Sequence, residues 1–411
     1  MKSGAENETD AAFEGNVALS QVSSQLAQGS KDTFGAVVSH VNRYSKVIVL
    51  TDVRSGASIA VWPAMQGRVL TSTVGGADGL SFGWVNRELI ASREVCEHVN
   101  SVGGEDRIWL GPEGGQFSIF FEPGAPFDLD HWYTPPALDT EPFETVRKSR
   151  TAVTFRKAFR LSNYSRTNFH VRIDRIVRLL SQERIWSSLG VACDAGVQAV
   201  GFESENTLTN LAAESWSKDT GLLSLWVLGQ FQSNSQTTIV LPIHSGSESR
   251  LGIPVTTDYF GVVPESRIDI REDVVLFKAD ANHRGKLGLS IQRAKGILGS
   301  YDGQNHVLTI VQYSQPSGFA EYANSSWQIQ TEPYKGDVAN CYNDGPSFSG
   351  GEQLGKFYEL ESSSPAKVLS SKETVSHIQR TIHLVGTEQQ LDRVCRATLG
   401  QSLEDASSLN T

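Results

Sequence analysis

The 411-residue chain is poor in cysteine and methionine and has no long apolar run. Its 4 cysteines lie far apart and include no Cys-x-x-Cys pair, which excludes a zinc ribbon and a dithiol redox motif and predicts isolated structural thiols. No stretch reaches the ~18 consecutive apolar residues of a transmembrane helix, so no membrane span is predicted. The polar N-terminus lacks the basic start and apolar core of a secretory signal, so we expect a cytoplasmic protein, or an exported one if a leader precedes it.

Other features are missing too, and each narrows the class of protein. There is no Gly-Lys-Ser/Thr phosphate loop and no His-Glu-x-x-His zinc motif. No internal period of about 20–50 residues is present, which disfavours a propeller. Lys and Arg total 36 against 46 for Asp and Glu, and a net charge of −10 repels phosphate backbones, so no nucleic acid partner is expected. The sequence leaves the oligomeric state unknown.

Short strands joined by tight turns dominate the pattern that is present. The chain has 37 Gly, 18 Phe, 10 Tyr and 8 Trp, a composition that suits such strands. Because the strands follow one another without regular helices between them, we predict a mostly β protein with large antiparallel sheets. The strands are expected at residues 47–53, 57–62, 116–121, 169–174, 197–202, 222–228, 237–243, 274–277, 307–313 and 356–361.

One short helix is expected near each end of the chain. Residues 34–41 carry apolar side chains at helical spacing, and Ser30 or Asp32 is placed to cap the first turn. Residues 387–400 begin with a capping box and end on a glycine. The expected organisation is therefore a frayed tail at 1–30, a single β-sandwich domain at 31–400 and a polar tail at 401–411.

The segment at residues 100–116 combines several glycines with Asn100, Glu105, Arg107, Trp109 and Glu113. Glycine permits backbone bends that bring side chains together. Charged groups bind sugar hydroxyls and an indole stacks on the apolar faces of a sugar ring, so these five residues are candidates for sugar binding. The alternative is a turn-rich loop held together by an Arg–carboxylate pair.

Two further segments are rich in amide and carboxylate side chains. Asn206 lies in a run of Glu and Asn residues at 203–210 that reads equally well as a turn. Asn343 and Asp344 lie before a Gly-Pro pair, and Glu359 and Glu361 follow on the expected strand at 356–361. Because alternate strand residues share a face, these two carboxylates lie on one side at roughly 6–7 Å and shift each other's pKa. A solvated strand face is the alternative.

Two histidines alternate along residues 375–384. His377 and His383 fall on the same face of an expected strand, together with other polar side chains, while apolar residues occupy the opposite face. Such a pair is able to ligate a metal ion or transfer protons, although ordinary exposed histidines are the commoner case.

The chain resembles a bacterial family of unknown function in the galactose mutarotase-like, or aldose epimerase-like, β-supersandwich superfamily. The resemblance runs from about residue 47 to residue 400. The motifs that carry it are Gly103-Gly-Glu-Asp-Arg107, Gly111-Pro-Glu-Gly-Gly115, Trp226-Val-Leu-Gly229, Gly299-Ser-Tyr-Asp302, Tyr342-Asn-Asp-Gly-Pro346 and Phe357-Tyr-Glu-Leu-Glu-Ser-Ser-Ser-Pro365. It implies a large antiparallel β-supersandwich, and it implies a fold more firmly than an activity.

The resemblance also implies a chemistry. Aldose epimerases carry a general-base Glu shortly before a Pro on a late strand, which nominates Glu361, with Glu359 beside it. The epimerase general-acid histidine motif is absent, so His383 or His377 is the expected acid. A sugar would then open and reclose without a cofactor or metal. The alternatives are a glycoside hydrolase or lyase with paired carboxylates, and a sugar-binding protein that catalyses nothing.

Overall fold

Antiparallel β-sheet makes up most of the regular structure. The computed structural model describes residues 32–194, 196–346 and 353–410. Strands account for 38% and helices for 16%, so the expectation of a mostly β protein is confirmed. The expected tail at residues 1–30, with its candidate cap Ser30, lies outside the described residues.

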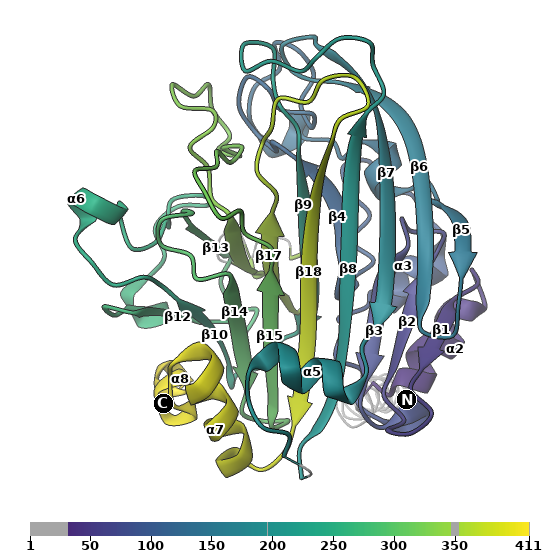
Figure 1. The fold of residues 1–411 in the computed structure, drawn as a ribbon, viewed down its shortest axis with the longest axis vertical. Coiled ribbons are helices and arrows are strands. Elements are labelled where there is room, and N and C mark those ends of the chain that lie inside the picture. The colour runs from purple at the N-terminus through teal and green to yellow at the C-terminus, as the bar shows by residue number, and fades with distance from the viewer. Residues whose placement is uncertain (1–31, 195, 347–352, 411) are drawn as a thin grey trace, which may run out of the picture.

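A sheet of ten strands forms one broad layer (Figure 1). Every neighbouring pair in it is antiparallel. In spatial order its strands are β11 (Ile268–Ile270), β12 (Val274–Lys278), β10 (Thr237–Pro242), β14 (Ile297–Asp302), β15 (Val307–Tyr313), β18 (Thr374–Val385), β8 (Gln198–Asn210), β7 (Asn168–Leu179), β6 (Ala152–Ser162) and β5 (Glu144–Lys148).

A sheet of five strands packs face to face with the first layer. Tyr358 of the small sheet and Ser300 of the large one share a hydrogen bond of 2.7 Å between their hydroxyls. One face of the small sheet therefore forms core, and the other face points away from the large sheet. In spatial order its strands are β13 (Gly285–Leu289), β16 (Ala339–Asn343), β17 (Phe357–Ser363), β9 (Ser224–Gln232) and β4 (Arg107–Gly111).

The N-terminal part adds a three-stranded sheet and a helix. The strands predicted at 47–53 and 57–62 are present as β1 (Ile48–Thr51) and β2 (Ser58–Trp62), which form an antiparallel hairpin, and β3 (Arg68–Thr73) completes the sheet. The predicted helix is α2 (Phe34–Asn42), and Thr33, not Asp32, accepts the capping bond from the Ala36 amide.

Helices cover one end of the large sheet's outer face (Figure 1). The predicted C-terminal helix is α7, with its capping box in place. The expected polar tail after Gly400 is wrong in part, because Leu403 and Ala406 are buried on a further helix turn. The helices on this face are α5 (Gln182–Leu189), α7 (Glu388–Leu399) and α8 (Leu403–Ala406), and α3 (Arg87–Ser92), α4 (Pro136–Asp139) and α6 (Glu248–Leu251) lie elsewhere.

The aromatic run at residues 116–121 is not the strand that we expected. Phe117, Phe120 and Phe121 are all buried, whereas a half-buried strand alternates. The Ser118 hydroxyl donates to the Glu113 carbonyl and accepts from the Phe120 amide, so local side-chain bonds replace a strand ladder.

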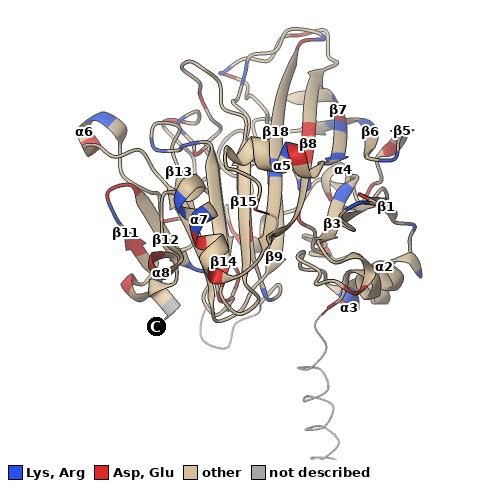
Figure 2. Cartoon of the chain, turned by 60° about the horizontal axis from the view of Figure 1, so that its bottom comes forward, with Lys and Arg blue, Asp and Glu red and all other residues tan. Residues whose placement is uncertain are grey.

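Charged groups occur both outside and inside the large sheet. On its outer face, Arg172 and Asp174 of β7 lie 2.7 Å apart, and Figure 2 shows charges of both signs on β7 and β8. Between the sheets, Arg175 forms a fully buried ion pair with Asp106 and donates to Asn206 at 2.7 Å.

No helix among the described residues is both long and apolar enough to span a membrane.

Candidate functional site

A cavity of about 570 Å³ lies on the face of the five-stranded sheet that points away from the large sheet. Each of the five strands contributes to its wall, and loops from distant parts of the chain complete it. Its volume falls within the range of small-molecule sites. The lining residues are mostly aromatic or charged: His98, Val99, Ser101, Arg107, Trp109, Glu113, Leu129, Asp130, Trp132, Trp226, Leu228, Gln230, Phe260, Arg284, Lys286, Trp327, Tyr342, Asp344, Gly345, Gln353, Leu354, Phe357 and Glu359.

One row of side chains across four strands forms the floor of this cavity. Strand register pairs Lys286 with Tyr342, Tyr342 with Glu359, and Glu359 with Gln230. Because directly paired residues project to the same face of a sheet, all four side chains point into the cavity. The floor thus presents, from one strand to the next, a cation, a phenol, a carboxyl and an amide.

Two ion pairs anchor the carboxylates of β17. Arg107 donates to Glu359 at 2.7 Å, and Lys286 donates to Glu361 at 3.1 Å. The indole N–H of Trp226 also donates to Glu361 Oε2, at 2.9 Å. Glu361 is fully buried and does not line the cavity, whereas Glu359 does. The face shared by the two carboxylates is therefore as predicted, but Glu359 is the one in contact with the cavity.

Glu359 differs from an exposed glutamate in its pKa. Burial raises the pKa of Glu359 to about 7, against the opposing effect of Arg107, and the neighbouring carboxylate of Glu361 adds to the rise. Oε1 of Glu361 has no hydrogen-bond partner within the described ranges, and protonation of Glu359 relieves the repulsion between the two carboxyls.

This shift predicts a pH dependence of stability that needs no knowledge of the ligand. Glu359 has a higher pKa in the folded state than in the unfolded state. Its contribution to the stability of the fold is therefore fully present below about pH 4.5 and is lost as the pH rises through about 7. The contribution is about 3 kcal/mol at most, from 1.36 kcal/mol per pKa unit. We therefore expect the free energy of unfolding, measured with urea across this pH window, to change less with pH for Glu359→Gln than for wild type. Parallel curves would contradict the shifted pKa.

The other charged groups of the cavity differ in their protonation. Burial lowers the pKa of Lys286, but the carboxylates of Glu361, Glu113 and Glu359 more than offset this, so the pKa lies above its usual value and the ammonium stays charged. Burial raises the pKa of Glu113 and of Asp344. Both carboxyls are therefore more easily protonated than exposed ones.

The structure brings two distant predicted segments together. Arg107 and Glu359 are 252 positions apart in sequence and form an ion pair, and the Arg107 guanidinium also lies 4.3 Å from the centre of the Trp109 ring. Of the residues nominated from sequence, Arg107, Trp109, Glu113, Asp344 and Glu359 line the cavity.

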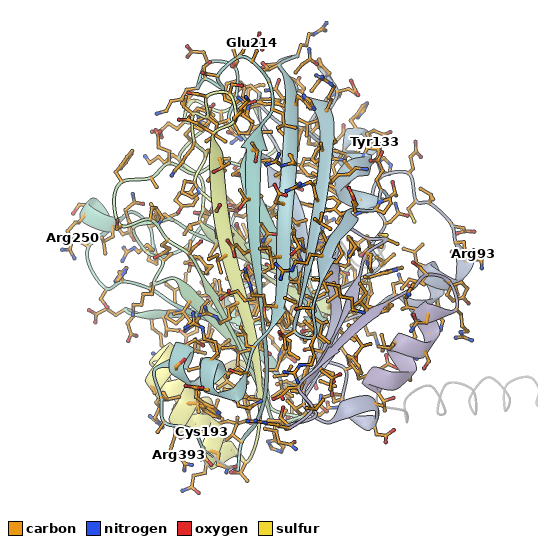
Figure 3. The ribbon with its side chains drawn as sticks, turned by 45° about the vertical axis from the view of Figure 1, so that its right-hand side comes forward. Arg93, Tyr133, Cys193, Glu214, Arg250 and Arg393 are labelled. Carbon is orange, nitrogen blue, oxygen red and sulfur yellow. The ribbon has the colours of Figure 1, made fainter. Side chains whose placement is uncertain are left out.

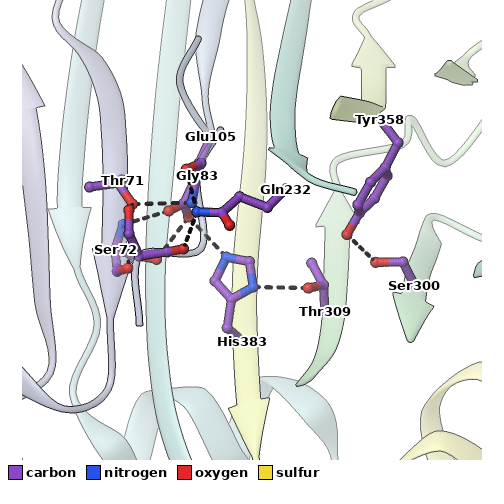
Figure 4. Close-up of polar contacts among 10 residues, drawn as sticks. Thr71, Ser72, Gly83, Glu105, Gln232, Ser300, Thr309, Tyr358 and His383 are labelled. Atoms are coloured by element: carbon purple, nitrogen blue, oxygen red, sulfur yellow. Dashed lines mark hydrogen bonds and ion pairs between the residues drawn. The ribbon is translucent and has the colours of Figure 1, made fainter. Parts of the chain in front are cut away.

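His383 and Glu105 lie elsewhere, between the sheets (Figure 4). His383 Nε2 contacts Glu105 Oε2 at 2.9 Å, and its Nδ1 contacts the Thr309 hydroxyl at 2.9 Å. Glu105 also accepts from the amide and hydroxyl of Ser72. Both side chains are buried with their bonding groups occupied, so the expectation that they act on a ligand in the cavity is wrong.

His377 and Asn206 are also interior residues of the large sheet. His377 shares hydrogen bonds with the hydroxyls of Ser362 and Ser314, at 2.7 and 3.2 Å. Burial lowers its pKa to about 3, so it is a neutral core histidine and not an acid facing the cavity. Asn206 lies within strand β8 and accepts a hydrogen bond from Arg175 of β7. This position excludes both the turn and the ligand contact expected from sequence.

Asn100 and Asn343 support the walls without facing the cavity. Asn100 donates to Asp139 at 2.7 Å from its side chain. Asn343 accepts from the Ala281 amide at 2.9 Å and donates to the His283 carbonyl at 2.8 Å. Both side-chain amides form their hydrogen bonds with other parts of the chain. Neither residue lines the cavity, contrary to the expectation from sequence.

Sequence reasoning missed Arg284, Lys286, Trp132 and Trp327 among the lining residues. Lys286 lies on β13, a strand interrupted by glycines that we did not predict. A lysine between glycine and leucine residues in a buried strand is a usable signal, because burying an ammonium requires a partner.

Comparison with protein-family models identifies the family of this chain. A family model described as "Family of unknown function (DUF6786)" matches residues 32–410. The chain belongs to this family. The DUF6786 match includes every residue that lines the cavity. No curated protein matches the chain.

Solved structures similar to this DUF6786 chain include proteins described as aldose 1-epimerase or galactose mutarotase-like. A "Putative aldose 1-epimerase" from Escherichia coli K12 is 12% identical with a TM-score of 0.49, over 83% of this chain and 99% of that one. The Slr1438 protein of Synechocystis sp. PCC 6803 is 12% identical with a TM-score of 0.47, over 84% and 96%. A galactose mutarotase-like protein from Lactobacillus casei ATCC 334 is 12% identical with a TM-score of 0.44, over 82% and 100%. These likenesses concern the fold alone.

Proposed function

We propose that the cavity binds a sugar and that the chain interconverts its anomers by general acid/base catalysis. The single observation that carries this proposal is Glu359, a carboxyl on the cavity floor whose pKa is raised to about 7. A proton-transfer group works best when its pKa lies near the working pH. The indoles of Trp109, Trp132 and Trp327 line the same cavity and offer apolar surfaces for a sugar ring.

Proton removal is assigned to Glu359. Its carboxylate form takes the proton of the anomeric hydroxyl while the bond from the anomeric carbon to the ring oxygen breaks, which leaves an open-chain aldehyde. Glu361 was the base implied by resemblance, but it is bonded to Lys286 and Trp226 and does not line the cavity. We give it the supporting role of a fixed negative charge that keeps the pKa of Glu359 high.

Proton donation to the ring oxygen is assigned to Glu113. Its carboxyl lines the cavity, and burial raises its pKa, so it holds a proton more readily than an exposed glutamate does. After rotation about the bond between the first two sugar carbons, both proton transfers run in reverse and the ring closes as the other anomer. The reaction therefore balances with no co-reactant.

The test is a screen of reducing sugars with the purified chain. Polarimetry and exchange NMR measure anomer interconversion of hexoses, pentoses and their acidic derivatives, and calorimetry measures binding. Acceleration above the spontaneous rate is the expected result. Cleavage of oligosaccharides instead would favour a hydrolase or lyase with paired carboxylates, and binding without turnover would favour a sugar-binding protein.

A further inference from the structure

Arg284 presents a guanidinium to the cavity from the residue before β13. It lies two positions before Lys286, and alternate residues of an extended chain share a face, so both cations point the same way. Its guanidinium carbon lies 4.4 Å from the centre of the Phe260 ring. This stacking holds the group in place without neutralising its charge.

Arg284 differs from the other two cations of the cavity because it has no counter-ion. Arg107 is paired with Glu359, and Lys286 is paired with Glu361. Within the described parts of the chain, Arg284 forms no ion pair and no side-chain hydrogen bond, and its Nε atom is buried without a partner. A partly buried cation without a counter-ion is costly, so such a group indicates an anion that the described residues do not supply.

Two carboxyls of the cavity lining on which the charge of Arg284 acts are already engaged or weakly charged. Asp344 accepts from the Tyr342 hydroxyl at 2.6 Å and from the Gly355 amide at 2.7 Å, which occupies both of its oxygens. Burial raises the pKa of Asp344 and of Glu113, which reduces the negative charge that either offers to Arg284.

We propose that the sugar bound in this cavity carries a carboxylate, as a hexuronic acid does, and that Arg284 binds this group. The inference rests on the proposed function in requiring that the cavity take a sugar. A guanidinium donates two parallel hydrogen bonds to a carboxylate, and the single negative charge matches Arg284, the cation of the cavity lining with no counter-ion among the described residues. A neutral sugar would leave Arg284 unpaired.

Calorimetric titration tests this with two uronates, glucuronate and galacturonate, against their neutral counterparts, glucose and galactose. We expect wild type to bind at least one uronate about 10- to 100-fold more tightly than the matching hexose, the range for a hydrogen bond to a charged group. Arg284→Gln should remove this preference while hexose binding is kept, and Arg284→Lys should retain part of it. Arg250→Gln is the matched control, because Arg250 is exposed on α6, outside the cavity lining (Figure 3).

The outcomes separate the two proposals. Equal binding of uronates and hexoses, unchanged in Arg284→Gln, would overturn the acidic-sugar inference and leave the proposed function standing. Binding of no sugar by a folded wild type would overturn both. A preference for glucose 6-phosphate over glucuronate would overturn the carboxylate assignment, since it would show that Arg284 takes a phosphate.

Discussion

Glu359→Gln should retain sugar binding and lose roughly 10²- to 10⁴-fold in turnover, the usual contribution of one positioned proton-transfer group. Glutamine keeps the size of the side chain and an oxygen that accepts from Arg107, so the floor of the cavity keeps its shape. It cannot take up a proton, so the transfer assigned to Glu359 is lost. Exchange NMR measures the turnover and calorimetry the binding.

The matched variants for this experiment are Glu361→Gln and Glu205→Gln. Glu205 forms an ion pair with Arg178 on the outer face of β8, so its change should leave turnover unaffected. Burial is the main cause of the raised Glu359 pKa, and Glu361→Gln removes the negative charge that adds to it, so the pH midpoint of turnover should move down from about 7. A large loss from Glu361→Gln beside a small one from Glu359→Gln would return the base to Glu361.

Arg175→Leu should destabilise the fold by about 3–5 kcal/mol, the cost of breaking a buried ion pair and leaving one charge behind. Arg175 is fully buried and bonds to Asp106 and Asn206, and the Asp106 carboxylate is itself fully buried. Chemical denaturation at pH 7 measures the loss.

Arg172→Leu provides the control on the same strand. Arg172 projects to the outer face of β7 and pairs there with Asp174, which is partly exposed. Exposed ion pairs contribute about 0–1 kcal/mol, so this variant should unfold close to wild type. Equal losses from the two substitutions would show that the interior pair does not need its charge balance.

The alternation of residues 356–361 was enough to predict that Glu359 and Glu361 share a face, because strand geometry is local. This strand meets Arg107 across the sheet, and the ion pair between Arg107 and Glu359 gives each of these partly buried charges a partner. The architecture followed from the run of strands.

The roles of His377, His383 and Asn206 were not predictable in the same way. A polar strand face looks identical in sequence whether it meets water or a second polar face across the core. Their partners, such as Glu105, come from distant strands, so the sequence offers no local sign of the buried bonds. Arg284 escaped notice because an arginine without a counter-ion is recognisable only when its surroundings are known.

The row across the cavity floor has a consequence for how the protein acquires activity. Lys286, Tyr342, Glu359 and Gln230 come from four strands of different parts of the chain, and only correct register brings them to one face. A shift of one residue in any of these strands would turn its side chain into the core. The row cannot exist until three separate strand pairings have closed, and such long-range contacts form late and slowly in folding. During refolding from urea, ligand binding should therefore recover after the bulk of the strand signal, with the site as the last part of the molecule to become native.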